Sequence, residues 1–368
     1  MHMFKVSAAL ALSAMAVNAA TIPGVLYTTE DTLPALWKGP MYNNFISSVN
    51  GTVSGVKRDD GGAVTIPWRY FKSIKGESKN TVVVVNGFTE TFAKYRELIY
   101  DFNQNGFNVL TWDHRGQGFA SRLGCINPAT VDVEFFNNYV SDMQTVLTAT
   151  KKGPLSGHNL LLWAHSMGGG IAASHMEQFP STFSSAVLSA PMMGINSDPY
   201  PEVLALPIAD IVLILGGPCA LPPGQSPTPE SLTDVAAKYE EQTTTTSYAR
   251  YSATIQPRVQ FPEIQMAGPG ARWLSQTLNA VQTIVAKASL ATTPIQLHQA
   301  GQDTFVTPQG QNVFCKGISV LGVPLLKPAP KCSFVSHPTA RHELWNEADS
   351  IRAPYFTKAV TFLKQYSI

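Results

Sequence analysis

The chain has 368 residues, of which 44% are hydrophobic and 14% are charged, and its formal net charge is +1. A chain of this length and apolar content can bury a large core, and its composition excludes an intrinsically disordered protein. The near balance of charge argues against a nucleic-acid-binding protein, which usually presents a basic face.

The first 19 residues have the three parts of an export signal. Lys5 supplies a basic start, Val6–Val17 form a short apolar segment, and Val17 and Ala19 satisfy the small-residue rule for cleavage after Ala19. A membrane anchor is the alternative, but the apolar segment is shorter than the ~20 residues of a helix that spans a bilayer. We therefore expect residues 1–19 to be a signal peptide, and the protein to be exported to a periplasm or secreted.

Apolar runs bounded by turn residues alternate with helical stretches along most of the chain. The expected strands are "TVVVVNGF" (81–88), "NVLTWDHRG" (108–116), "NLLLWA" (159–164), "SSAVLSAP" (184–191), "TPIQLHQAG" (293–301) and "CSFVSHP" (332–338). The expected helices include "FAKYRELIYDFNQNGF" (92–107), closed by Gly106, and "APYFTKAVTFLKQY" (353–366). This alternation predicts an α/β fold with a mostly parallel central sheet and helices on both faces. The mixed stretch "VTIPWRYFKS" (64–73) predicts an early antiparallel edge strand.

Residues 192–268 break this alternation. They lie between two expected strands and contain an apolar run, Val203–Leu215, that a proline and an aspartate interrupt. We interpret the segment as an inserted cap, or lid, so that residues 20–191 and 269–368 form the two parts of one core. The apolar run either lines a pocket or packs the cap onto the core, and we favour the pocket because exposed apolar caps usually mark apolar ligands.

The four cysteines permit two disulfides if the chain is exported. Pairing Cys315 with Cys332 would close a short loop, and pairing Cys125 with Cys219 would then tie a core loop to the cap. Buried free thiols are the alternative. No Cys-x-x-Cys or His-Glu-x-x-His spacing indicates a metal, and we expect no cofactor.

The stretch "NLLLWAHSMGGGIAASHMEQF" (159–179) joins an expected strand to an expected helix at Ser166. This succession predicts a nucleophile elbow, in which Ala164 and Gly168 must be small because the turn is tight. The helix then aims its N-terminal amides and the positive end of its dipole at the serine. The small-x-Ser-x-small pattern also occurs by chance about once in a chain of this length, so an ordinary glycine-rich turn is the alternative.

A nucleophilic serine needs a base to take its proton and an acid to orient that base. His337 and His342 compete as the base, and we prefer His342 because it lies in the loop between the last strand and the last helix. Asp303 follows a strand and is the expected acid, with a helix cap as the alternative. The amides of Phe88 and Met167 are the expected donors to an oxyanion.

Six motifs occur in the order found in the lysophospholipase and monoacylglycerol-lipase branch of the α/β-hydrolases: "WDHRGQG", "AHSMGGG", "SAPMMGI", "GPGARWL", "QAGQD" and "ARHELWNE". From about Gly87 to the C-terminus the chain resembles this serine hydrolase family, and bacterial lysophospholipases in particular. The resemblance implies an α/β-hydrolase fold with Ser166, Asp303 and His342 as the catalytic triad. It also implies oxyanion donors at the amides of residues 88 and 167.

Two residues depart from the pattern of this family. Asn86 precedes Gly87 where many relatives carry a histidine, and Ala164 replaces the common first glycine of the elbow. Neither change removes a catalytic group, because the oxyanion donors are backbone amides. The export signal and the cap sequence are also less typical, so they leave the exact substrate open.

The expected function is hydrolysis of carboxylic esters, with one acyl chain cleaved from a lysophospholipid or monoacylglycerol through an acyl-enzyme on Ser166. A general carboxylesterase acting on short-chain, phenolic or polymeric esters is the alternative enzyme. Epoxide and haloalkane hydrolases are disfavoured because they need an aspartate in place of this serine. An inactive binding protein is the alternative of another class, and the complete triad argues against it. The expected partners are an ester substrate and, transiently, a membrane surface, while the oligomeric state stays open.

Overall fold

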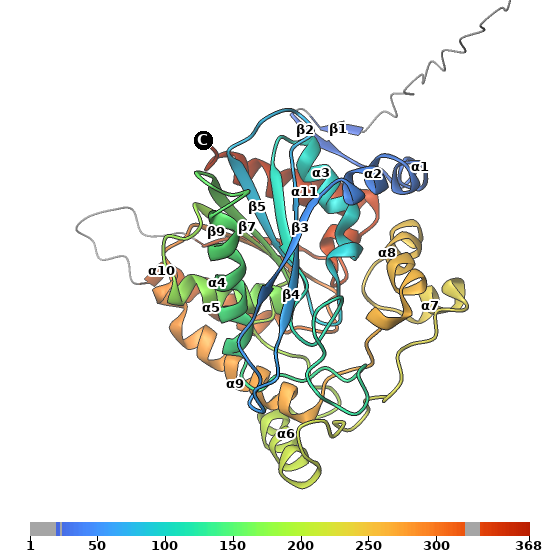
Figure 1. The fold of residues 1–368 in the computed structure, drawn as a ribbon, viewed down its shortest axis with the longest axis vertical. Helices are drawn as coiled ribbons and strands as arrows, with labels where there is room; N and C mark the ends of the chain where they lie inside the picture. The colour runs from blue at the N-terminus through green and yellow to red at the C-terminus, as the bar shows by residue number, and fades with distance from the viewer. Residues whose placement is uncertain (1–19, 23, 321–331) are drawn as a thin grey trace, which may run out of the picture.

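The structure is a computed structural model that describes residues 20–22, 24–320 and 332–368. The expected signal peptide, residues 1–19, lies outside the described residues. A twisted central sheet runs through the molecule, and helices cover both of its faces (Figure 1). The predicted α/β architecture is therefore confirmed.

Among the described residues the sheet has eight strands, and these include all six strands expected along the apolar runs. In chain order the strands of the sheet are β3 (Val49–Ser54), β4 (Thr65–Phe71), β5 (Asn80–Val85), β6 (Asn108–Trp112), β7 (Asn159–His165), β8 (Ser185–Ser189), β9 (Ile295–Ala300) and β10 (Cys332–His337). Their order across the sheet is β10-β9-β8-β7-β5-β6-β4-β3. Strands β5 to β10 run parallel, whereas β4 is antiparallel to β6 and to β3. A separate hairpin pairs β1 (Ala20–Ile22) with β2 (Val25–Tyr27).

The position of β4 corrects one expectation. Residues 64–73 were expected to form an edge strand, but β4 lies between β3 and β6, and β3 forms the edge. The sequence of β3, "VNGTVS", has polar and small residues between its two valines. It therefore lacks the apolar run that identifies the inner strands.

Helices flank the sheet on both sides. They are α1 (Leu33–Lys38), α2 (Pro40–Ile46), α3 (Arg96–Gln104), α4 (Asn137–Lys151), α5 (Met167–Gln178), α6 (Glu202–Gly216), α7 (Val235–Glu241), α8 (Tyr248–Gln260), α9 (Ala271–Lys287), α10 (Pro308–Val320) and α11 (Asp349–Lys364). A 3-10 turn, η1 (Phe92–Tyr95), leads into α3. Gly106 lies just beyond the end of α3 and has a φ of 88°, in the left-handed region. None of the helices in the described part of the chain is long and apolar enough to cross a membrane.

Strand β5 illustrates how the two faces are buried. Val83 and Val85 belong to the apolar cluster under α4 and α5, while Val82 and Val84 belong to the cluster under α3 and α11. Side chains alternate between the faces of a strand, so a strand covered on both faces needs an unbroken apolar run. All four valines are accordingly buried.

Between β8 and β9 the chain leaves the sheet and forms helices α6 to α9. Helix α6 packs on α9, whereas α8 packs on α1 and η1. In Figure 1, α6 therefore forms the tip of the molecule and α8 lies to one side of it.

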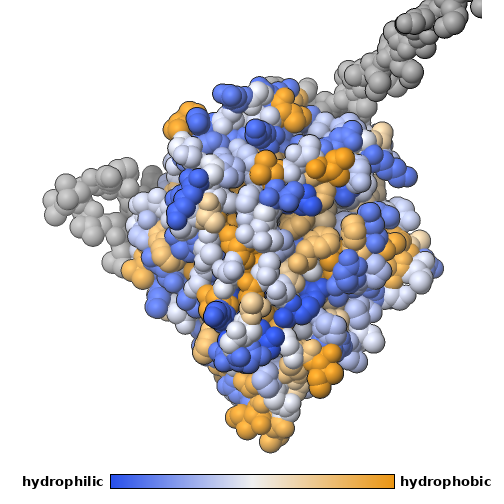
Figure 2. Space-filling view, in the orientation of Figure 1, coloured by the Kyte–Doolittle hydropathy of each residue, from blue (hydrophilic) through white to orange (hydrophobic). Residues whose placement is uncertain are grey.

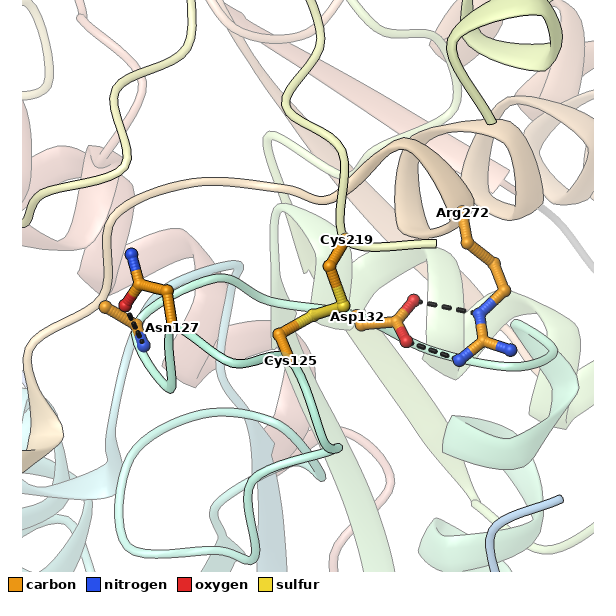
Figure 3. Close-up of a disulfide and its surroundings, with 6 residues drawn as sticks. Cys125, Asn127, Asp132, Cys219 and Arg272 are labelled. Atoms are coloured by element: carbon orange, nitrogen blue, oxygen red, sulfur yellow. Dashed lines mark hydrogen bonds and ion pairs between the residues drawn. A yellow bond between two sulfur atoms is a disulfide. The ribbon is translucent and has the colours of Figure 1, made fainter. Parts of the chain in front are cut away.

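The structure contains the two disulfides that the sequence permits, Cys125–Cys219 and Cys315–Cys332, rather than free thiols at these four cysteines. The first joins the loop after β6 to the residues that follow α6 (Figure 3). Its sulfur atoms lie close to the carboxylate of Asp132, but they are bonded to each other and are not free thiolates.

An ion pair and a backbone hydrogen bond reinforce this connection. Arg272 at the start of α9 forms a bidentate pair with Asp132 (Figure 3). The amide of Gly270 donates to the carbonyl of Val131 at 2.7 Å. The base of α6 and the start of α9 are therefore attached to the same core loop.

Candidate active site

Ser166 lies at the turn between β7 and α5. Its backbone has φ of 51° and ψ of −124°, a left-handed conformation that a residue with a side chain rarely adopts. The turn is held because the amide of Ser166 donates to the carbonyl of Ser189 on the neighbouring strand at 3.2 Å. A Cβ at Gly168 would lie 2.4 Å from the carbonyl oxygens of Val85 and Asn86, so only glycine fits there. The chain thus forms the tight elbow that the sequence predicts.

The structure brings together the three side chains expected to form a triad. The Oγ of Ser166 lies 2.9 Å from Nε2 of His342, and Nδ1 of His342 lies 2.7 Å from Oδ2 of Asp303. Ser166 and His342 are 9% and 6% exposed, so the hydrogen bonds are shielded from bulk water but border a cavity. In the tautomer that allows catalysis, the serine hydroxyl donates to Nε2 and Nδ1–H donates to the carboxylate.

Asp303 also organises its own loop. Its Oδ1 accepts hydrogen bonds from the amides of Phe305 and Val306 at 2.8 and 3.1 Å. The alternative interpretation of Asp303 as a helix cap does not hold, because α10 begins only at Pro308. Burial raises the pKa of the Asp303 carboxyl, but the hydrogen bond and charge of His342 and the two amides together hold that pKa below its usual range. The group therefore stays ionised at neutral pH.

The competing histidine lies elsewhere. Nε2 of His337 is 2.9 Å from Nδ1 of His298, and the two rings stack. His165, inside the elbow, contacts the carbonyl of Ser189 through Nδ1 at 3.1 Å, and its ring centroid is 4.7 Å from that of His342. Burial lowers the pKa of His165 to about 3, so its ring packs beside the candidate base without adding a positive charge.

The two expected oxyanion donors have free amides. Among the described residues, no acceptor is bonded to the amide of Phe88 or to that of Met167, the first residue of α5. The amides of Gly87 and Thr89, on either side of Phe88, are both engaged. A Cβ on Gly87 would come within 3.2 Å of Cβ of Ser166, which shows how closely this loop approaches Ser166. The arrangement can accept negative charge beside the serine.

Sequence reasoning missed a buried carboxylate that holds this loop. Glu90 accepts hydrogen bonds from the amide of Gly87 at 2.6 Å and from the hydroxyl of Tyr95. Lys94 bridges Glu90 and Glu343 at 2.6 and 2.5 Å. Burial raises the pKa of Glu90, but the charge of Lys94 and the hydrogen bonds outweigh it and lower the pKa to about 2. A permanent negative charge therefore holds the peptide between Asn86 and Gly87, one residue before Phe88.

Gln117 fixes the same loop from the other side, and sequence reasoning assigned it no role. Its Nε2 donates to the carbonyl of Gly87 at 2.8 Å and to that of Glu90 at 3.0 Å, while its Oε1 accepts from the amide of Thr89 at 3.1 Å. The signal was present, because Gln117 belongs to the motif "WDHRGQG" and Glu343 to the motif "ARHELWNE". The motifs indicate a family, and the structure indicates what these two side chains contact.

A cavity of about 810 Å³ opens above Ser166 and His342. One part of its wall is apolar and comes from Ile195, Ala205, Ile208, Trp273, Leu274 and Leu278. Another part is polar and includes Lys94, Tyr251, Arg258 and Glu343. The site therefore suits a molecule with an apolar portion and a polar portion.

Helix α6 only partly fulfils the expectation for residues 203–215. Ala205 and Ile208 line the cavity, and the carboxylate of Asp210 accepts a hydrogen bond from the hydroxyl of Ser275 on α9 at 2.6 Å. Several of its large side chains face solvent instead, namely Val203, Leu204, Ile211, Ile214 and Leu215. Figure 2 shows apolar surface gathered at the tip of the molecule that α6 forms. Residues 203–215 therefore line the cavity with only a few side chains, and many of the others face solvent instead of packing onto the core.

The family of the chain follows from a comparison with known families. The family described as serine aminopeptidase, S33 (Hydrolase_4) matches residues 76–349. The chain belongs to this family. Membership of the S33 family, together with the sheet and the elbow, makes the protein a hydrolase with the α/β-hydrolase fold, and it confirms the resemblance of the sequence motifs.

Individual members and structures agree with this assignment. Lysophospholipase L2 from Escherichia coli is 28% identical over 342 residues, which cover 92% of this chain and 94% of that protein. A probable lysophospholipase L2 from Haemophilus influenzae is 28% identical over 83% of this chain and 90% of its own length. A monoglyceride lipase from Saccharomyces cerevisiae, solved with a substrate analogue, has the same fold, with a TM-score of 0.63, 17% identity, and coverage of 88% of this chain and 97% of that chain.

Proposed function

We propose that this hydrolase cleaves the single acyl ester of lysophospholipids or monoacylglycerols through an acyl-enzyme on Ser166. The observation that carries the proposal is the unbroken chain of hydrogen bonds from Ser166 through His342 to Asp303 at the floor of the cavity. The names of the relatives support the lipid substrate class.

The geometry supports the following steps. Oγ of Ser166 attacks the ester carbonyl while Nε2 of His342 takes the hydroxyl proton, and Asp303 stabilises the resulting imidazolium. The carbonyl oxygen becomes an oxyanion that accepts hydrogen bonds from the amides of Phe88 and Met167. The intermediate collapses, and the alcohol leaves with the proton from His342. Water, deprotonated by the same histidine, then releases the fatty acid and restores the serine.

A fluorophosphonate probe separates an activated serine from an inert one. We expect the probe to label the protein on Ser166, and the Ser166→Ala variant to stay unlabelled while it folds normally. Labelling that persists in the variant, or an unlabelled native protein, would contradict the proposal. A parallel panel compares a lysophospholipid, a monoacylglycerol, a short phenolic ester and an aminoacyl anilide. Preference for the phenolic ester would favour the general carboxylesterase, and cleavage of the anilide alone would favour a peptidase.

We further propose that residues 192–268 act as a cap on the core formed by residues 20–191 and 269–368, and that the cap holds the acyl chain. The support is the apolar cavity wall that Ala205 and Ile208 of α6 share with α9. Each methylene buried there contributes about 0.8 kcal/mol, or roughly fourfold in affinity.

Chain-length dependence tests this acyl site. Catalytic efficiency of the native protein should rise over several added carbons, and Ile208→Asp should flatten that rise because it places an unpaired carboxylate in the apolar wall. Leu213→Asp is the matched control, because Leu213 lies on the same helix but does not line the cavity. Parallel slopes for the native protein and Ile208→Asp would remove α6 from the acyl site.

We propose that the exposed side of α6 rests transiently on a lipid surface. Val203, Ile214 and Leu215 are about 80% exposed, and the same helix also lines the cavity, so contact there would bring lipid next to the substrate site. Replacing Ile214 and Leu215 together by glutamate should weaken co-sedimentation with phosphatidylcholine vesicles. A control carries the same charges at Ile74 and Val313, which are exposed elsewhere. Equal sedimentation of both variants would contradict the contact.

We also infer export, with residues 1–19 removed. Two disulfides are typical of proteins that fold in an oxidising compartment, and they support this inference. Sequencing the N-terminus of the protein from its native cell should give a chain that begins at Ala20. Protein from a soluble cell extract that still begins at Met1 would contradict export with cleavage.

A further inference from the structure

Helix α8 presents one distinct stripe to the cavity. Tyr251, Thr254, Ile255 and Arg258 all line it, and their spacing of three, four and seven residues places them on one face of the helix. The stripe carries a hydroxyl group near one end and a guanidinium group at the other. It lies apart from the apolar wall formed by α6 and α9 (Figure 1).

The two donors on this stripe have no partner in the described part of the chain. Tyr251 is only 7% exposed, and its buried hydroxyl forms no hydrogen bond with a described residue. The guanidinium of Arg258 forms no ion pair or side-chain hydrogen bond with a described residue, whereas Lys94, the other cation lining the cavity, is held by two carboxylates. A buried donor such as the Tyr251 hydroxyl is costly without an acceptor, and the half-buried guanidinium of Arg258 has no counter-charge within the described chain. A ligand that accepts hydrogen bonds from both groups would therefore stabilise the site.

The charges around Tyr251 indicate how the pair would act. Burial and the nearby carboxylate of Glu230 raise the pKa of the tyrosine, although Arg258 acts in the opposite direction. The hydroxyl therefore keeps its proton and remains a donor, and Arg258 lies near enough to affect it. Glu230 is not neutralised by Arg258, because its ion pair is with Lys238 at 3.9 Å.

We propose that Arg258 and Tyr251 bind the phosphate of a substrate head group, so that the cavity selects lysophospholipids over monoacylglycerols. A phosphate oxygen accepts hydrogen bonds from both a guanidinium and a phenol, and Arg is well suited to this geometry. The glycerol of a monoacylglycerol is uncharged, so it cannot neutralise the positive charge of Arg258. This inference rests on the proposed function, because it assigns a head-group site to the same cavity.

Binding without turnover gives the first test. In a Ser166→Ala background, affinities for octylphosphocholine and for 1-O-octylglycerol are measured by calorimetry below the micelle concentration. Arg258→Gln should weaken binding of octylphosphocholine by about tenfold or more relative to the glycerol ether, because a charge-assisted hydrogen bond is lost. Tyr251→Phe should weaken it less. Arg258→Lys should recover part of the loss, and Lys75→Gln, which removes the same charge from an exposed loop, should cause none.

Turnover separates this inference from the proposed function. The ratio of kcat/KM for a lysophospholipid to kcat/KM for a monoacylglycerol with the same acyl chain should fall about tenfold in Arg258→Gln. An unchanged ratio, or equal weakening of both octyl ligands in a variant with native Tm, would overturn the head-group site. If the native protein cleaves neither lipid, the proposed function fails, whereas the calorimetric comparison still decides whether Arg258 binds phosphate.

Discussion

The sheet end that carries Ser166 and helix α6 border the same cavity, but they differ in where they place polar and apolar side chains. Around the serine, polar side chains such as Glu90, Gln117 and Asp303 are buried and bonded on two or more sides. Helix α6 instead leaves large aliphatic side chains such as Ile214 and Leu215 in solvent. Burying polar side chains costs desolvation free energy, and leaving large aliphatic side chains in solvent forgoes the free energy of burying them. Both features therefore point to functional regions.

The difference separates two tasks. Chemistry at the serine needs atoms held at fixed distances, and a network of buried hydrogen bonds supplies that rigidity. The proposed contact with a lipid needs exposed apolar area, and α6 has such area on a helix that also lines the cavity. Substitutions in the first region should therefore change catalytic rates, whereas changes in the second should alter stability and substrate preference.

The largest expected effect comes from the base. His342→Ala should lower kcat by about a thousandfold or more, because the serine then has no group to take its proton. His337→Ala should lower it by less than about tenfold, because His337 contacts His298 and not the serine. Steady-state kinetics on one ester substrate compare the two variants. Equal losses, or the opposite order, would move the base to another residue.

A second expected effect comes from the loop that carries Phe88. Gln117→Ala removes three hydrogen bonds that fix the peptides around Gly87 and Thr89, so the oxyanion donor should lose its alignment. We expect kcat for a short ester to fall by about 10- to 100-fold with little change in KM. Gln144→Ala, on the far helix α4, is the control. A variant that loses stability but retains kcat would make Gln117 purely structural.

Removing each disulfide in turn tests how much it contributes to the free energy of unfolding. The Cys125–Cys219 bond spans 94 residues and Cys315–Cys332 spans 17, so chain-entropy arguments give the first the larger effect. Replacing Cys125 and Cys219 by serine should lower the free energy of unfolding by about 2–4 kcal/mol and should affect KM for a long-chain ester more than kcat. Urea unfolding of both double variants measures the order. A larger loss from the Cys315–Cys332 pair would contradict this order.

The smallest expected effect concerns an exception within the core. Glu177 on α5 is buried, its Oε1 has no partner among the described residues, and burial raises its pKa to about 8, although the charge of Lys287 acts the other way. A carboxyl group whose pKa is raised on folding binds a proton more tightly in the folded state. Stability is therefore lost as pH rises from the ordinary glutamate range to about 8.

Glu177→Gln removes this titration. The variant should melt roughly 2–4 °C above the native protein at pH 9 and at nearly the same temperature at pH 4.5. Thermal melting across this range measures the difference. A gap of the same size at both pH values would mean that the glutamine acts through packing and not through charge.

Much of the fold and the site could be predicted because the signals are local. The valine run of β5 identifies a strand buried on both faces, and the succession of strand, Ser166 and helix identifies the elbow. Chain order and loop position were enough to choose His342 over His337. Each of these signals lies within a few residues of the feature that it predicts.

The features that were missed depend on distant parts of the chain. Lys94 contacts Glu343, 249 residues away, and no local pattern predicts such a pair. Strand β3 has little apolar character, so its place at the edge follows only from pairing with β4. Helix α6 is apolar nearly all round, and without a polar face its sequence does not indicate which residues line the cavity.

The turn at Asp303 determines more than the position of a carboxylate. Because Oδ1 must accept from the amides of Phe305 and Val306, an asparagine here would keep its carbonyl oxygen on the turn and direct its NH2 group at His342. The imidazole would then have to accept through Nδ1 and carry its hydrogen on Nε2, facing the serine as a donor. Two backbone amides thus select the tautomer of a histidine 39 residues later, and an isosteric exchange would reverse the direction in which its proton can move.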